Sequence, residues 1–136
     1  MGKPLRVLIV EDSEDDAIFL LHELRKGGYD VTFERVDTAP AMSEALDKQT
    51  WDIVIADYIM PHFSAPDALI LLKAREIDLP FIVVSGKIGE DIAVATMKAG
   101  AHDYIMKNNL KRLVAAVERE LRDAVERQDL APPGGR

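Results

Sequence analysis

Residues 52–57 read Asp-Ile-Val-Ile-Ala-Asp, four apolar residues between two aspartates. A short apolar run with polar ends and no helical period is typical of a strand that is buried on both faces of a sheet. Similar runs occur at 80–84 (Pro-Phe-Ile-Val-Val) and at 5–10 (Leu-Arg-Val-Leu-Ile-Val). The segments 31–36 and 103–106 are interpreted in the same way, so that the chain has five candidate strands.

Segments with helical spacing of their apolar residues separate these strands. The predicted helices span residues 13–26, 39–48, 64–76, 90–99 and 110–127. Strict alternation of helices with apolar strands indicates a parallel sheet that is covered on both faces. Because crossovers are right-handed, we expect an α/β, flavodoxin-like (βα)5 fold, with a doubly wound five-stranded parallel sheet in the strand order 2-1-3-4-5.

The ends of the first helix carry recognisable signals. Ser13 and Asp16 have the spacing of a capping box, in which each side chain accepts a hydrogen bond from the other residue's backbone N–H. Gly27 and Gly28 follow Lys26 and are expected to end the helix.

The chain has 136 residues, 48% of them hydrophobic, which fits one domain with a real core. We expect that domain over residues 1–128, followed by a flexible Pro/Gly-rich tail at 129–136. No apolar run has the length of a membrane span, and the N-terminus lacks a secretory signal. The absence of cysteine fits a cytoplasmic protein. The net charge of −7 argues against direct binding to nucleic acid.

Polar side chains follow the strands at the edge where ligands bind in such sheets. Glu11 and Asp12 follow the first strand, and Asp57 follows the third, which is its neighbour in the predicted order. Three carboxylates in one place raise their own pKa values unless a cation compensates them. Mg²⁺, which takes carboxylates, waters and phosphate oxygens, is the expected cation.

Two further strand ends carry groups that suit phosphate. Ser85 follows the fourth strand with a hydroxyl, and Lys107 follows the fifth with a compact positive charge. Taken singly, each of these residues is more often a turn residue or a solvated lysine. Together with the carboxylates and the metal, they indicate a phosphoryl-transfer site.

Four segments, taken as an ordered set, resemble the receiver domain of bacterial two-component response regulators, in its single-domain form. They are 10–13 (Val-Glu-Asp-Ser), 53–61 (Ile-Val-Ile-Ala-Asp-Tyr-Ile-Met-Pro), 83–86 (Val-Val-Ser-Gly) and 100–107 (Gly-Ala-His-Asp-Tyr-Ile-Met-Lys). The resemblance covers about residues 5–125, and any one of the four segments alone would be weak evidence.

The resemblance implies a role for each matching residue. Asp57 would accept a phosphoryl group from a phosphohistidine on a sensor histidine kinase or a phosphotransfer protein. Asp12 would bind Mg²⁺ directly, Glu11 would assist, and the backbone carbonyl of Ile59 would be a further ligand. Lys107 would hold a phosphoryl oxygen. The chain would catalyse its own phosphorylation and dephosphorylation without being a classical enzyme.

The family also implies a switch. Ser85 would move toward the phosphoryl group, and Tyr104 would turn inward behind it. The altered face would be formed by the helix 90–99, the strand 103–106 and the helix 110–127. This face would signal to a downstream protein whose identity the sequence does not reveal, and a homodimer through it is an open alternative.

The sequence departs from the family pattern in three places. Asn108 stands where the family usually has a cis proline after its lysine, so the loop geometry there is in doubt. The segment 63–66 (Phe-Ser-Ala-Pro) replaces a stretch that often contains glycine. Glu11 stands where aspartate is commoner, which lengthens the reach of that carboxylate.

Two residues near the expected site have open interpretations. On a helical wheel Phe19 falls almost opposite the apolar face of the first helix, so it is either a docking anchor for the phosphodonor or a tolerated surface aromatic. Lys87, two residues past Ser85, is more easily explained as a solvated loop lysine than as a contact to the phosphoryl group.

Three rival classes can be weighed against this interpretation. A haloacid-dehalogenase phosphatase needs a second aspartate two residues after the first, where Ile59 stands. A nucleotide-binding protein needs a glycine-rich phosphate loop, and neither G-x-G-x-x-G nor G-x-x-x-x-G-K-[ST] occurs. A pseudo-receiver would lack one of the site groups. Whether the chain is a stand-alone regulator, a phosphorelay intermediate or part of a larger kinase stays open.

Overall fold

The computed structural model describes residues 2–86 and 89–130, in a regular succession of strands and helices. Its elements are β1 (Lys3–Val10), α1 (Glu14–Lys26), β2 (Tyr29–Val36), α2 (Ala39–Lys48), β3 (Ile53–Ala56), α3 (Ala65–Ala74), β4 (Phe81–Ser85), α4 (Glu90–Lys98), β5 (Asp103–Met106), the 3₁₀ helix η1 (Lys107–Arg112) and α5 (Leu113–Leu130).

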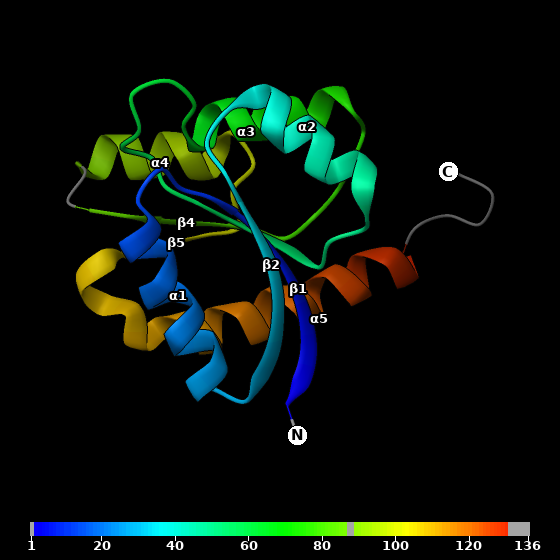
Figure 1. The fold of residues 1–136 in the computed structure, drawn as a ribbon. Helices are drawn as coiled ribbons and strands as arrows, with labels where there is room; N and C mark the ends of the chain where they lie inside the picture. The colour runs from blue at the N-terminus through cyan, green and yellow to red at the C-terminus, as the bar shows by residue number, and fades with distance from the viewer. Residues whose placement is uncertain (1, 87–88, 131–136) are drawn as a thin grey trace.

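The strands form one parallel sheet in the order β2-β1-β3-β4-β5. Figure 1 shows α1 and α5 on one face of this sheet, and α2, α3 and α4 on the other. The predicted α/β flavodoxin-like fold and its strand order 2-1-3-4-5 are therefore confirmed.

Alternate residues of each strand supply two separate cores. Val7 and Ile9 of β1 pack with α1 and α5, whereas Leu8 and Val10 pack with α2 and α3. All four side chains are fully buried. Burial on both faces explains why β3, and β4 up to Ser85, are apolar throughout, whereas the edge strand β2 alternates with polar residues.

The first helix begins as predicted but with only half of the expected capping box. The Ser13 hydroxyl accepts a hydrogen bond from the Asp16 backbone N–H at 3.2 Å. The backbone N–H of Ser13 donates instead to the Glu11 carboxylate at 3.1 Å. The prediction of a reciprocal Ser13–Asp16 pair is thus wrong in its second half, because a closer acid occupies that donor.

The starts of β2 and α5 differ from the sequence expectation. Strand β2 begins at Tyr29, directly after Gly28, whose φ of 98° turns the chain out of α1. The segment after Lys107 first forms η1, in which Asn109 leaves the helical region, and only then becomes α5.

Helix α5 continues to Leu130, two residues past the predicted domain end at residue 128. Residues 131–136 lie outside the described part of the chain, so the expected tail stays a prediction. Within the described residues, no helix combines the length and the hydropathy needed to cross a membrane.

Candidate functional site

The sheet register brings the strand ends together at one edge. Val10 of β1 pairs with Ala56 of β3, so Glu11 and Asp57, each the next residue along, leave neighbouring strands side by side. Ser85 pairs with Met106, and Lys107 follows directly. Four strands thus deliver the predicted side chains to one place, as expected for the carboxyl edge of a doubly wound sheet.

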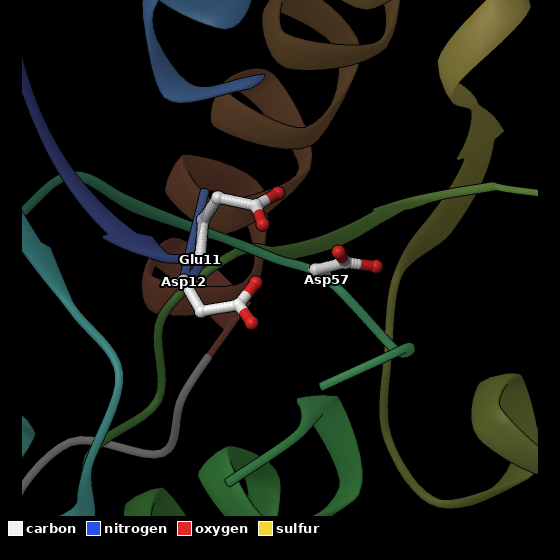
Figure 2. A group of neighbouring side chains, drawn as sticks. All are labelled: Glu11, Asp12 and Asp57. Atoms are coloured by element: carbon white, nitrogen blue, oxygen red, sulfur yellow. The ribbon is translucent and has the colours of Figure 1, made fainter. Parts of the chain in front are cut away.

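Three carboxylates gather at this edge. Glu11, Asp12 and Asp57 each offer one oxygen, and these oxygens lie within 4.8 Å of one another. Figure 2 shows the Glu11 and Asp12 side chains directed toward the side on which Asp57 lies. Glu11 and Asp57 are 1% and 4% exposed, whereas Asp12 is exposed to solvent.

Both carboxylate oxygens of Asp57 accept hydrogen bonds. Oδ1 accepts from the Ser85 hydroxyl at 2.7 Å and from the Ile59 backbone N–H at 3.0 Å. Oδ2 accepts from the Lys107 ammonium at 2.9 Å. The buried carboxylate is therefore held in one orientation by a hydroxyl, a backbone amide and a cation.

The Lys107 ammonium contacts three acids at once. Its Nζ lies 2.9 Å from Asp57 Oδ2, 3.1 Å from Glu11 Oε1 and 2.5 Å from Asp16 Oδ2. Burial lowers the pKa of Lys107, but the hydrogen bonds to the three carboxylates outweigh it and leave the pKa above its usual value. Lys107 is thus a fixed positive charge at the centre of the acids.

For Glu11, in contrast to Lys107, burial outweighs the favourable contacts of the charged form. Burial raises the pKa of its carboxyl to about 7, against the opposing effects of the Ser13 N–H and of Lys107. A divalent cation would compensate the same buried charge.

The donor set fits Mg²⁺. Carboxylate oxygens are the protein ligands that this hard cation prefers, and it binds through one or two carboxylates with waters and phosphate oxygens completing its shell. Glu11, Asp12 and Asp57 are the three residues, among those described, whose oxygens converge in this way. The side chain of Ile59 is 56% exposed, and a ligand role for its backbone carbonyl stays a prediction.

Tyr104 lies next to this site on β5. Its side chain is half-buried against the core on the α2–α3 face, and its hydroxyl is 3.4 Å from the Gly86 carbonyl oxygen. The two residues predicted as the switch therefore stand on adjacent strands, β4 and β5.

The segments in which the sequence departs from the family are ordered locally. No cis peptide bond occurs in the described chain, and Asn108 lies inside η1. Phe63 is 5% exposed and packs into the core, while Ser64 and Asp67 form a complete capping box at the start of α3. Lys87 lies outside the described residues.

A cavity of about 310 Å³ adjoins the site between α1 and the segment after β5. Its lining residues are Asp16, Phe19, Leu20, Val84, Lys107, Asn108 and Leu110. Phe19 is 59% exposed, as the helical wheel predicts. The cavity places this aromatic ring beside the ammonium that contacts Asp57.

Sequence reasoning missed one member of the cluster, Asp16. It was interpreted as a capping residue, whereas its carboxylate binds Lys107. Its position in the first turn after Glu11 and Asp12 was the available signal, because that turn starts at the edge of the sheet where the site lies.

Comparisons with known proteins agree with this fold. Residues 7–118 match the family described as response regulator receiver domain. The chain is 36% identical over 118 residues to the transcriptional regulatory protein PrrA of Mycobacterium tuberculosis, a match that covers 86% of this chain and 50% of that protein. It is 32% identical over 130 residues to the sensory transduction protein RegX3 of Mycolicibacterium smegmatis, covering 95% and 56%.

Solved structures give the same result. A signal receiver domain from Vibrio parahaemolyticus superposes with a TM-score of 0.80 at 27% identity, covering 95% of this chain and 99% of that one. The receiver domain of a signal transduction histidine kinase from Syntrophus aciditrophicus gives 0.71 at 29% identity, covering 88% and 91%. The chain spans about half the length of the curated relatives it matches.

Proposed function

The chain belongs to the response regulator receiver domain family, and from that premise we propose that Asp57 accepts a phosphoryl group from a phosphohistidine. The proposal rests on the groups that surround the Asp57 carboxylate. Its buried carboxylate lies between the Ser85 hydroxyl and the Lys107 ammonium, beside two further acids. The phosphodonor would be a sensor histidine kinase or a phosphotransfer protein.

The chemistry follows from these contacts. A carboxylate oxygen of Asp57 attacks the phosphorus, the P–N bond of the donor breaks, and the imidazole leaves with the bonding electron pair and takes up a proton. Lys107 and Ser85, which contact Asp57, would donate hydrogen bonds to phosphoryl oxygens, where negative charge is spread in the transition state. The protein would act on itself in this way, both in accepting the group and in losing it to water.

Glu11, Asp12 and Asp57 would hold Mg²⁺, with the Ile59 carbonyl as a further ligand. When bound, the metal neutralises charge between the carboxylates and the incoming phosphoryl oxygens. The four acids at this edge, Glu11, Asp12, Asp16 and Asp57, outnumber the single lysine, and this excess of negative charge supports a requirement for a cation.

Phosphorylation would then act on Ser85 and Tyr104. The Ser85 hydroxyl already donates to Asp57, so a phosphoryl group there would become its acceptor. Movement of Tyr104 would alter the face formed by α4, β5 and α5. A hollow of about 380 Å³ lies on this face between α4 and β5, beside the exposed side chains of Val94 and Met97.

The partners of this face and of the whole protein are also proposals. A downstream protein would bind the α4-β5-α5 face, or a second copy would dimerise through it. We propose no direct contact with nucleic acid, because the net charge of −7 repels phosphate backbones. A cytoplasmic location follows from the proposed phosphohistidine donor.

Acetyl phosphate provides a direct test of the phosphoacceptor. With Mg²⁺ present, the intact mass of the protein should rise by one acid-labile phosphoryl group, and chelation with EDTA should prevent this. Asp57→Asn should abolish the labelling. Asp37→Asn, which alters the exposed aspartate after β2, is the matched control and should be labelled normally. Full labelling of the Asp57 variant would refute the assignment.

A further inference from the structure

The Asp16 carboxylate makes a contact that the position of the residue in the sequence does not predict. It stands in the first turn of α1, where a capping box would turn its carboxylate back toward the Ser13 backbone. That backbone N–H is already taken by Glu11 Oε2 at 3.1 Å. The Asp16 carboxylate instead reaches across 91 residues of sequence to Lys107.

The contact with Asp16 adds to the demand on the N–H donors of Lys107. An ammonium group has three such donors and no acceptor. Nζ donates to Asp16 Oδ2 and to Asp57 Oδ2, and it forms an ion pair with Glu11 Oε1 at 3.1 Å. A phosphoryl oxygen that binds Lys107 therefore competes with three carboxylates for the same cation.

Asp16 differs from the other two acids. Glu11 and Asp57 belong to the carboxylate group that would hold the metal, whereas Asp16 does not. Its side chain is 34% exposed, against 2% for Glu11 and 4% for Asp57, so release of its carboxylate to water costs the least. Asp16 is therefore the acid outside the metal group whose release would free Lys107 for the phosphoryl group at the lowest cost.

We propose that Asp16 is a positioning residue that competes with the phosphoryl group for Lys107 and so restrains phosphorylation of Asp57. The inference rests on the proposed phosphoacceptor function and deepens it. In the unphosphorylated protein the Lys107 ammonium is bound to Asp16 on α1. In the phosphorylated protein Asp16 loses that contact, and its negative charge then lies close to the phosphoryl oxygens without a partner.

Asp16→Asn removes the charge and keeps the size of the side chain. Because a hydrogen bond with an ionised partner is roughly twice as strong as a neutral one, the lysine should be released more easily. Beryllium trifluoride, which mimics a phosphoryl group on Asp57, should bind the variant about three- to tenfold more tightly in the presence of Mg²⁺. The rate of labelling by acetyl phosphate should rise in the same proportion.

Two further variants separate competition from general electrostatics. Asp15→Asn removes one negative charge from the same turn at an exposed residue, and it should leave the affinity for beryllium trifluoride unchanged. Asp16→Glu keeps the charge and should behave like the wild type. An equal gain in the Asp15 variant, or an unchanged or weaker affinity in the Asp16→Asn variant, would overturn the proposal.

A readout without metal tests the resting contact itself. In ¹⁵N-detected NMR of the Mg²⁺-free protein, the Lys107 ammonium protons should exchange with water more rapidly in Asp16→Asn than in the wild type or in Asp15→Asn. Unchanged exchange would also overturn the inference. Failure of the phosphoacceptor proposal looks different, because the wild type would then not be labelled at Asp57 at all.

Discussion

His102 holds the beginning of β4 by two hydrogen bonds, at the edge of the sheet opposite the proposed phosphoryl-transfer site. Its backbone N–H donates to the Phe81 carbonyl at 2.8 Å, and its Nδ1 accepts from the Phe81 N–H at 2.9 Å. The second bond requires an unprotonated Nδ1. Burial lowers the pKa of His102, and the positive charge of Arg127 lowers it further, against the opposing charges of Glu120, Asp78 and Asp123.

This residue should make stability depend on pH in a predictable direction. Because its pKa is lower in the folded state than the unfolded value of about 6.5, the unfolded chain binds more protons as the pH falls. The free energy of unfolding should therefore hold its His102 contribution above pH 6.5 and lose it as the pH drops toward the folded pKa. Urea unfolding at pH 7.5 and pH 5.5 measures the loss.

The matched control for this prediction is His102→Asn, whose side-chain oxygen can accept from the Phe81 N–H but does not titrate. We expect the variant to lose less stability over the same interval, with acid titration of carboxylates accounting for what remains. Identical pH dependence in the two proteins would show that His102 is not responsible.

At the scale of single elements, the C-terminus of α3 contains a strained residue. Glu76 has a φ of 56°, in the left-handed region that side chains disfavour. Its N–H bonds the Lys73 carbonyl and the N–H of Ile77 bonds the Leu72 carbonyl, a pattern that usually has glycine at this position.

Glu76→Gly should consequently stabilise the protein. Relief of the left-handed strain is worth about 1–2 kcal/mol, from which the greater freedom of glycine in the unfolded chain subtracts roughly 0.5–1 kcal/mol. We expect a net gain of about 0.5–1 kcal/mol in urea unfolding. Glu76→Ala keeps the strain and should show no gain, and a gain of equal size there would implicate the lost charge instead of the backbone.

The first turn of α1 both caps the helix and positions acids of the candidate site. Ser13 caps the helix with its hydroxyl, while its backbone N–H fixes the Glu11 carboxylate. The same turn presents Asp16 to Lys107. One helical turn therefore orients two of the three acids that contact the lysine.

At the scale of the whole molecule, several apolar side chains of the described residues are exposed on different elements, and two groups of them lie near proposed functional surfaces. Phe19 lies on α1 beside the proposed phosphoryl-transfer site, and Ile92, Val94 and Met97 lie on α4, on the other face of the sheet. We propose the first as the docking point of the phosphodonor and the second as part of the output face. The docking point would then lie on the layer formed by α1 and α5, and the α4 part of the output face on the opposite layer.

Replacement of Phe19 tests the docking part. Phe19→Ala should slow phosphoryl transfer from a phosphohistidine protein by about tenfold, since truncation of a residue that anchors an interface costs more than about 1 kcal/mol. Labelling by acetyl phosphate should not change, because no partner is docked. Ile70→Ala on α3, where the side chain is 66% exposed, is the control and should affect neither reaction. Equal slowing with both donors would argue against docking, and no slowing with either donor would support the interpretation of Phe19 as a tolerated surface aromatic.

The amino-acid sequence by itself determined the succession of elements and the location of the site. The central strands β3 and β4 are apolar because both of their faces are buried, and that pattern is local, so it is visible without coordinates. Once parallel strands are inferred, the residues after them must share one edge, which is why Glu11, Asp12, Asp57, Ser85 and Lys107 could be grouped in advance.

Tertiary structure alone decided which side chains contact one another at that edge. Glu11 displaces Asp16 from the Ser13 backbone, and Asp16 pairs with a lysine 91 residues away. A local rule such as the capping box predicts hydrogen-bond partners from their spacing in the sequence. In the folded chain, residues that are distant in sequence also come close enough to form these bonds. The left-handed conformation of Glu76 and the hydrogen bonds between His102 and Phe81 were not predicted for the same reason. The first occurs in an irregular segment, and the second joins residues that are distant in sequence.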